Sequence, residues 1–311
     1  MSEAIATGQV AVGIDAGGSA TRARAVAAGR VVFEGHGGPG NPLAATADVL
    51  TASYRAALAG CPEPARIAAC VSGAGGTPQR EQISGLLADL FPAAAICVVP
   101  DYAGAWLAAP EGTDAVVIAG TGSAVCSLAP DGGHDVSGGR GWILGDRGSA
   151  ARLGQAVLEW FCDDSESDPA IAGLVGDCLG LTDWRQIVRA LAASANPAAL
   201  LARAAPALTG AAASGSDWAA ATLSAEMGAL GATTAGHIER HLRPGAEVRI
   251  ALAGGVWTSP AARTAFLAAL TGARAASRVI LSWPVEPLNG AVGLASTMAR
   301  PNNPEANLIG D

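Results

Sequence analysis

The sequence predicts an α/β fold built from two related lobes. A short apolar run that ends in a glycine-rich turn and resumes as a second strand occurs twice, around residues 9–26 and around residues 114–128. Elsewhere, runs of strand length alternate with segments of helical spacing. If the two lobes face each other, their glycine-rich turns lie on opposite walls of one cleft. We expect lobes at 1–113 and 114–287, a C-terminal helix 288–300 that completes the first lobe, and a flexible tail at 301–311.

The first lobe is expected to begin with a β-hairpin. Residues 9–14 are apolar and end at Asp15, and residues 21–26 alternate apolar side chains with arginines, so both segments are predicted strands. Strand, glycine turn and strand differs from the strand, turn and helix order of Rossmann and P-loop folds. The other elements expected here are strands 31–35, 66–71 and 95–99 and helices 44–59, 79–90 and 102–109.

The second lobe repeats the hairpin and then becomes helical. We predict a strand at 114–119, a turn at 120–123 and a returning strand at 124–128, followed by an irregular glycine-rich stretch at 132–149. Residues 153 to about 235 are rich in alanine and leucine, which favours helices. Breaks are expected near Asp168-Pro169, Asn196-Pro197 and Ser214-Gly215, and strands 247–253 and 278–282 complete the second lobe. The helix expected at 290–298 lies in the segment 288–300 that is assigned to the first lobe.

The composition is that of an acidic globular protein without a single lysine. Hydrophobic residues make up 50% and charged residues 15%, and the net charge of -8 argues against a nucleic-acid partner. All 19 basic residues are arginine. This excludes the lysine-dependent phosphate sites of P-loop proteins and protein kinases, and also Schiff-base chemistry. If the protein handles ATP, it does so with backbone amides, hydroxyls, a metal ion and arginine.

The cysteines and histidines do not form a metal site in the sequence. The six cysteines lack a CxxC pair, and several lie in apolar runs, which favours buried free thiols of a reducing cytoplasm over iron–sulfur ligation. His237 and His241 are four residues apart on an expected helix, but zinc would need further ligands. The sequence also has no signal-peptide pattern and no run of roughly 20 apolar residues. We expect a cytoplasmic protein with no membrane partner.

The two glycine-rich turns are candidate phosphate sites. Glycine lets the backbone approach an anion closely and aim several N–H groups at it, and neighbouring hydroxyls add donors. One such turn is often only a tight hairpin, but two on matching strands, with a third glycine pair, strengthen the interpretation. Asp15 could hold Mg²⁺, mainly through water. The candidate ATP contacts are Gly17, Gly18, Ser19 and Thr21, then Gly120, Thr121, Gly122 and Ser123, and finally Gly254 and Gly255.

Asp101 is the candidate general base. It follows a predicted strand and opens a predicted helix, a position at the cleft of an α/β lobe. Transfer of a phosphoryl group to a hydroxyl needs a carboxylate that accepts the proton. Aspartate is also favoured as a helix N-cap, and its position alone leaves both interpretations open.

The segment 138–150 combines many glycines with a tryptophan and an aspartate. It could be a structured Ω-loop with no ligand. It could also face a sugar, with Asp146 accepting hydrogen bonds from substrate hydroxyls.

These motifs resemble the BadF/BadG/BcrA/BcrD ATPase family of the actin/hexokinase/Hsp70 superfamily, and most closely its N-acetylglucosamine kinase branch. The resemblance covers roughly residues 10–298. Residues 141–149 are similar to the family's G-W-x-L-G-D-E-G-S loop. The phosphate motifs match at 12–19 and 118–123, the adenosine motif at 251–256, and the final helix motif at 287–295.

The resemblance implies two actin-like (ribonuclease H-like) lobes around an ATP and substrate cleft, and a homodimer. It implies transfer of the γ-phosphate of ATP, with Mg²⁺, to the 6-hydroxyl of N-acetylglucosamine or a related hexosamine. Asp101 would then be the base for that hydroxyl. The sugar would be contacted by Asn41, Ser72, Gly73, Asp101 and Asp146, with Gly139 and Ala150 lining the same pocket.

Three positions depart from the family pattern. The glutamate of the G-D-E-G-S loop is Arg147, a charge reversal that could pair with Asp146, re-aim the loop or adapt the site to another sugar. The threonine of the first turn is Ser19, and the residue after the second turn is Ala124. The sequence therefore supports specificity for an N-acetyl group less strongly than it supports a kinase. The alternatives are a kinase for glucosamine, N-acetylmuramate or another hexose, an ATPase that activates a reductase, and a sugar-sensing regulator.

Overall fold

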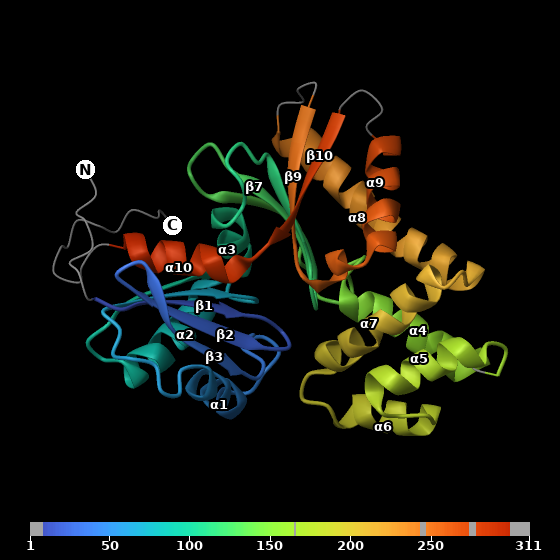
Figure 1. Ribbon diagram of the computed structural model, residues 1–311, viewed down its shortest axis with the longest axis horizontal. Helices are drawn as coiled ribbons and strands as arrows, with labels where there is room; N and C mark the ends of the chain where they lie inside the picture. The colour runs from blue at the N-terminus through green and yellow to red at the C-terminus, as the bar shows by residue number, and fades with distance from the viewer. Residues whose placement is uncertain (1–8, 165, 243–246, 274–277, 299–311) are drawn as a thin grey trace. The chain divides into compact units, whose positions relative to one another are not determined.

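The computed structural model describes residues 9–164, 166–242, 247–273 and 278–298, which form two α/β units (Figure 1). The first unit takes its described residues from 1–110, 129–134 and 285–311, and the second from 111–128 and 135–284. Each unit contains a five-stranded sheet.

The sheet of the first unit has the order β3-β2-β1-β4-β5. β1 pairs antiparallel with β2 and parallel with β4, so the hairpin lies at one side and the crossover strands at the other. Because β1, β4 and β5 run parallel, Ala16, Val71 and Pro100 lie in register at the same edge of the sheet. The elements are β1 (Ala11–Ala16), β2 (Thr21–Ala27), β3 (Arg30–Gly37), α1 (Ala47–Ala57), β4 (Arg66–Val71), α2 (Thr77–Leu90), β5 (Ala95–Pro100), α3 (Asp101–Leu107) and α10 (Pro287–Thr297).

Helices cover both faces of this sheet, and alternation along β1 decides which residue faces which helix. Val12 and Ile14 join the core that α1 and α2 complete, whereas Ala11 packs with Ala295 of α10. Gly13 shares the α10 face, where an added Cβ would lie 2.3 Å from the backbone nitrogen of Val292. Only glycine therefore permits the close approach of α10 across β1, on the face opposite α1 (Figure 1).

The second unit repeats the pattern with the order β10-β9-β6-β7-β8. β6 pairs antiparallel with β7 and parallel with β9, as β1 does with β2 and β4. Its core combines inward residues of the sheet with Leu223, Met227 and Leu230 of α8 and Phe266 of α9. The elements are β6 (Ala115–Ala119), β7 (Ser123–Leu128), β8 (His134–Gly138), α4 (Ala150–Asp164), α5 (Pro169–Leu179), α6 (Trp184–Ala193), α7 (Pro197–Ala213), α8 (Asp217–His241), β9 (Glu247–Ala253), η1 (Gly255–Thr258), α9 (Pro260–Ala273) and β10 (Arg278–Val285).

Three elements differ from the sequence-based expectation. The stretch 132–149, expected to be irregular, contains strand β8, which pairs at the edge of the sheet beside β7. The helical region has an additional break, because Gly180 adopts a left-handed conformation after α5 and Asp183 caps α6. Helix α9 was not expected at all. The tail predicted at 301–311 lies outside the described residues.

The described residues contain neither a candidate membrane span nor a candidate metal cluster. None of their helices combines the length and the apolar character that a bilayer crossing requires. They also contain no group of three or more histidine, cysteine or acidic side chains that could hold a metal ion. Both ring nitrogens of His237 bond to hydroxyls, those of Ser127 and Ser137, each at 2.9 Å. The cysteines are free thiols.

Candidate functional site

The first glycine-rich turn is braced by the loop that precedes α1. Gly17 donates to the carbonyl of Ala20 at 2.8 Å, and Gly40 donates to the carbonyl of Gly17 at 2.9 Å. Thr21 is buried and donates its hydroxyl to the carbonyl of Gly38 at 2.9 Å, so its side chain supports the turn from beneath. Ser19 is exposed and Gly18 is half-buried. The turn is thus a fixed hairpin whose tip remains accessible.

Asp15, at the end of β1, lies in an ion-pair network that the sequence did not reveal. One guanidinium nitrogen of Arg22 lies 2.5 Å from an Asp15 oxygen and 2.7 Å from a Glu286 oxygen. Burial raises the pKa of the Asp15 carboxyl, although Arg22 acts in the opposite direction. The side chain of Glu286 comes from the residue before α10, far along the chain. Two carboxylates therefore share one arginine beside the turn.

Asp15 and Glu286 fit a magnesium ion that is also held by nucleotide phosphates and water. Mg²⁺ keeps several waters and takes one or two carboxylates together with phosphate oxygens. Asp15 offers an oxygen donor of the right kind, and Glu286 stands near it. The ion would supply charge neutralisation of the phosphates. Arg22 is the cation that pairs with Asp15, so Arg22 and a bound metal ion would have to share the Asp15 carboxylate.

Asp101 begins α3 directly after β5. Its side chain does not cap the helix, whose N-cap is Pro100, and instead accepts a hydrogen bond from the neighbouring N–H of Tyr102 at 3.0 Å. Burial, and then the charge of Asp15, raise the pKa of Asp101 to about 6. Hydrogen bonds from Tyr102 and Ser72 oppose this rise. The carboxylate is therefore charged at neutral pH and still basic enough to accept a proton.

The other sugar candidates of the first unit gather around Asp101. Asn41 donates its amide to the hydroxyl of Ser72 at the long distance of 3.5 Å, and Ser72 also bonds to Asp101. Gly73 has φ of 78°, and a Cβ there would lie 2.2 Å from the Asn41 side-chain oxygen. The amide of Asn41, the hydroxyl of Ser72 and the carboxylate of Asp101 thus form one polar cluster. Asp15 is close enough for its charge to raise the pKa of Asp101.

The second glycine-rich turn is tied to the N-terminus of α4. Ala150 donates to the carbonyl of Gly120 at 2.8 Å, and Ala151 donates to that of Thr121 at 3.2 Å. Gly139 donates to the carbonyl of Ser123 at 2.9 Å, which places the start of the 139–149 loop against the same turn. Gly120, Thr121, Gly122, Ser123, Gly139 and Ala150 are therefore neighbours in the second unit.

Asp146 lies over this turn in a strained backbone conformation. Its φ is 50°, a value that non-glycine residues rarely adopt. Burial raises the pKa of the Asp146 carboxyl, whereas backbone hydrogen bonds, first from Gly141 and Arg140, lower it. A Cβ on Gly122 would lie 2.8 Å from an Asp146 oxygen, so a side chain at this position would displace the carboxylate. Strain kept at a loop of this kind is typical of a ligand site.

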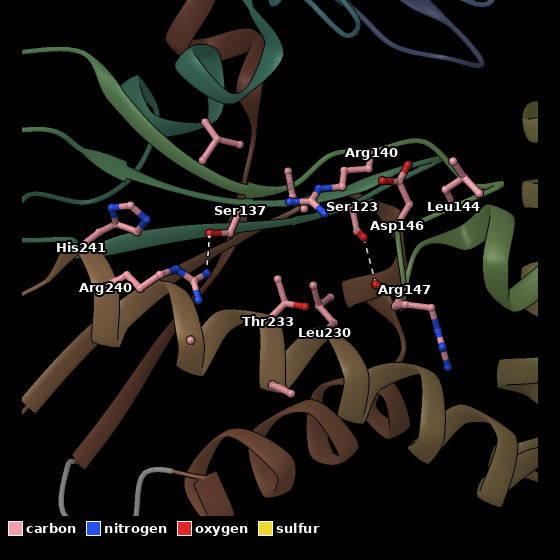
Figure 2. A pocket seen from close by; sticks show the side chains of 16 residues that line it. Ser123, Ser137, Arg140, Leu144, Asp146, Arg147, Leu230, Thr233, Arg240 and His241 are labelled. Atoms are coloured by element: carbon pink, nitrogen blue, oxygen red, sulfur yellow. Dashed lines mark hydrogen bonds between the residues drawn. The ribbon is translucent and has the colours of Figure 1, made fainter.

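Arg147 does not pair with Asp146. Its Nε lies 2.9 Å from an oxygen of Glu226 on α8, and the same oxygen accepts the N–H of Gly148 at 3.1 Å. Figure 2 shows the side chains of Arg147 and Asp146 pointing in opposite directions from the loop. The pairing with Asp146 is therefore wrong, and Arg147 instead links the loop to α8, a contact that was not among the possibilities considered.

The third glycine pair follows β9 and meets the second turn. Gly254 has φ of 108°, and a Cβ there would lie 2.4 Å from the carbonyl oxygen of Ala119, the last residue of β6. Gly255 opens the short helix η1 and has open space around it. The pair therefore lies beside Gly120.

The structure thus assembles the candidates into two clusters, one in each unit. The first holds the turn 17–21 with Asp15, Asn41, Ser72, Gly73 and Asp101, and the second holds the turn 120–123 with Gly139, Asp146, Ala150 and Gly254. Sequence reasoning missed Arg22, Glu286 and Glu226. No local signal marks Glu286 and Glu226, because their partners Arg22 and Arg147 lie far away in the sequence. Arg22, in contrast, lies directly opposite Asp15 in the predicted hairpin, and that pairing was a signal that could have identified it.

Comparisons with known proteins agree with this architecture. A candidate N-acetylglucosamine kinase from Chromobacterium violaceum is 27% identical, with 93% of this chain and 100% of that chain covered and a TM-score of 0.68. A candidate N-acetylglucosamine kinase from Porphyromonas gingivalis is 18% identical (92% and 98% covered, TM-score 0.66). A ROK family glucokinase from Streptomyces griseus, solved with glucose and AMPPNP, is 16% identical (93% and 97% covered, TM-score 0.56). The expected actin-like α/β fold is confirmed.

A search of curated proteins finds no significant match. The family model for the BadF/BadG/BcrA/BcrD ATPases matches residues 12–295, which include both phosphate turns, Asp101, the Asp146 loop and the Gly254 pair. The chain therefore belongs to the BadF/BadG/BcrA/BcrD ATPase family.

Proposed function

We propose that this protein is an ATP-dependent sugar kinase that transfers the γ-phosphate of ATP to a hydroxyl of an amino sugar, with N-acetylglucosamine or a related hexosamine as the acceptor and its 6-hydroxyl as the nucleophile. Family membership supports the use of ATP. The relative from C. violaceum, described as a candidate N-acetylglucosamine kinase, supports the class of acceptor.

One observation carries the proposal, namely the environment of Asp101. A pure ATPase needs only to position water, whereas a sugar kinase needs a base beside sugar-binding groups. Asp101 is a partly buried carboxylate with a pKa of about 6, and it shares Ser72 with Asn41. Amide and hydroxyl side chains of this kind suit the hydroxyl groups of a sugar.

In the reaction, the oxygen of the acceptor hydroxyl bonds to the γ-phosphorus, and Asp101 accepts the proton that this hydroxyl loses. The bond between that phosphorus and the β,γ-bridging oxygen breaks, and ADP leaves with the electron pair. The glycine-rich turns would hold the phosphates through backbone N–H groups, because lysine is absent from the sequence. Asp15 would take Mg²⁺ together with phosphate oxygens and water. Asp146 would orient the sugar from the second unit.

The competing functions predict different chemistry. An activator of a reductase needs a cysteine-ligated cluster, whereas burial raises the pKa of Cys70 and Cys97 here, which disfavours ligating thiolates. A sugar sensor would bind sugar without turnover, and the retained base would then have no use. A homodimer and a cytoplasmic location also belong to the proposal, and light scattering of the purified protein tests the dimer.

The test is ADP release measured across a panel of sugars. N-acetylglucosamine, glucosamine, N-acetylmuramate, N-acetylmannosamine and glucose are each added to the protein with ATP and Mg²⁺. We expect a hexosamine to stimulate ADP release far above the rate without sugar. Release that no sugar stimulates would refute the kinase and favour the ATPase. Stimulation by glucose alone would keep the kinase and refute the amino-sugar acceptor.

A further inference from the structure

A pocket of about 640 Å³ lies in the second unit, between β8, the loop 139–147 and the C-terminal half of α8 (Figure 2). One end is formed by Ser123, a candidate ATP contact, and Asp146, the proposed sugar contact. The other end is lined by Ser137, Thr233 and Arg240, none of which the proposed reaction uses. The pocket therefore extends the site toward a polar wall that has no assigned role.

The charge of this lining is unusual for a protein with a net charge of -8. Among the described residues, three arginines and a histidine line the pocket, and Asp146 is its only acidic lining residue. Arg147 forms an ion pair with Glu226, and His241 lies 3.2 Å from Asp135. Within the described part of the chain, neither Arg140 nor Arg240 has an acidic side chain within ion-pair distance. Two guanidinium groups are therefore available to a ligand.

Arg240 is held in place by a network that supplies no opposite charge. Its guanidinium donates to the hydroxyl of Ser137 at 3.2 Å, and Ser137 bonds to the buried ring of His237 at 2.9 Å. The other nitrogen of His237 bonds to Ser127 at 2.9 Å. Burial, and then the neighbouring His241, lower the pKa of His237 to about 4, so the ring is neutral at pH 7. The network orients a cation without neutralising it.

Arg140 reaches the same pocket from the loop. Its backbone follows Gly138 and Gly139, which have φ of 81° and 65° and turn the chain out of β8. In Figure 2 its side chain extends from the loop toward Ser137, and Arg240 extends toward Ser137 from α8. Arginine presents paired N–H donors that match the oxygens of carboxylates and phosphates.

We propose that this pocket binds an oxyanion, either a phosphate ester or a carboxylate carried by a carbohydrate, between Arg140 and Arg240. The carbohydrate part rests on the proposed function, because Asp146 at the other end is the proposed sugar contact. The oxyanion part rests on the two guanidinium groups alone, because the Thr233 hydroxyl donates to the Ala229 carbonyl and the Ser137 hydroxyl bonds to His237. The site would admit an acidic sugar or a sugar phosphate and would favour it over a neutral sugar of the same size.

The experiment is a calorimetric titration of the intact protein without nucleotide. The probes are glucosamine 6-phosphate, glucuronate, neutral N-acetylglucosamine and inorganic phosphate. We expect at least one charged sugar to bind more tightly than the neutral one, with an affinity that falls as salt is added. Arg140→Gln and Arg240→Gln should each weaken that binding about tenfold or more, the loss expected for a charge-assisted hydrogen bond. Arg189→Gln, which removes an exposed arginine from α6, is the matched control and should leave binding unchanged.

The variants and probes separate the possible outcomes. Arg140→Gln leaves the Ser137–His237 network intact, so a loss shared by both arginine variants cannot come from a disturbed helix. A preference for glucosamine 6-phosphate or for glucuronate identifies the oxyanion. Equal affinity for charged and neutral sugars, no binding of any of the charged probes, or a loss in only one arginine variant would overturn the inference. Binding of inorganic phosphate alone would overturn its carbohydrate part. Sugar-dependent ADP release, measured separately, shows whether the proposed function itself stands.

Discussion

Replacing Asp101 with asparagine should make the protein more stable and far less active. Asparagine keeps the shape of the side chain and an oxygen that can accept the Tyr102 N–H, but it carries no charge and cannot accept the substrate proton. A general base typically contributes roughly 10²–10⁴-fold to the rate, so turnover should fall by that factor. Because the base must be ionised, wild-type kcat/KM should also fall as the pH drops below about 6.

The gain in stability follows from the rise in the Asp101 pKa from 3.8 to about 6. A raised pKa means that the folded state binds the proton more tightly than the unfolded state does. Ionised Asp101 therefore lowers the free energy of unfolding. This penalty is absent at pH values well below the pKa of the unfolded state, and it grows as the pH rises toward the pKa of the folded state. The two pKa values give a penalty of about 1.5 kcal/mol at pH 5 and about 3 kcal/mol at pH 7.5, which Asp101→Asn should remove.

The assay is urea unfolding of wild type and Asp101→Asn at both pH values, together with sugar-dependent ADP release. The matched control is Asp168→Asn, which changes the N-cap of α5, because asparagine caps a helix as well as aspartate does. A stability gain that does not grow with pH would refute the account of burial. Full activity of Asp101→Asn would refute its role as base.

Two further predictions concern the second unit. Gly254→Ala should destabilise the protein by about 2 kcal/mol or more, because the positive φ and the Ala119 carbonyl leave no room for a methyl group. Gly255→Ala is the control, because Gly255 has open space around it. Equal urea midpoints of the two variants would contradict the account. Glu226→Gln should cost about 1.5–3 kcal/mol, because it removes the charge that accepts from Arg147 and Gly148. The control Glu239→Gln on the exposed face of α8 should have little effect, and equal losses in both variants would show that Glu226 is not a brace.

Local patterns in the sequence were sufficient for the features that depend on neighbours along the chain. The two hairpins were predicted because apolar runs end in glycine turns, and the structure has β1–β2 and β6–β7 at those positions. The break between α5 and α6 and the start of α9 also carry local signals in the sequence, namely Gly180, Asp183 and Pro260. Strand β8 carried none, because it is half-exposed and is stabilised by its pairing at the sheet edge.

Contacts between distant residues were beyond sequence reasoning. The effect of Arg147 could not be settled, because its partner Glu226 is 79 residues away on a helix whose orientation depends on core packing. The sharing of Arg22 between Asp15 and Glu286 depends in the same way on the close approach of α10 across Gly13. In both cases sequence reasoning identified one charged residue, Arg147 or Asp15, but not the partners that define its role.

The central claim, that this chain phosphorylates a sugar, is tested most directly by identifying the product. Wild-type protein and Asp101→Asn are incubated with ATP, Mg²⁺ and N-acetylglucosamine, and the sugar is analysed by mass spectrometry and phosphorus NMR. The account predicts one phosphate ester on the 6-oxygen, formed in step with ADP by the wild type and at a rate roughly 10²–10⁴-fold lower by the variant. ADP and inorganic phosphate without any sugar phosphate, from this sugar or from any other sugar of the panel, would contradict it.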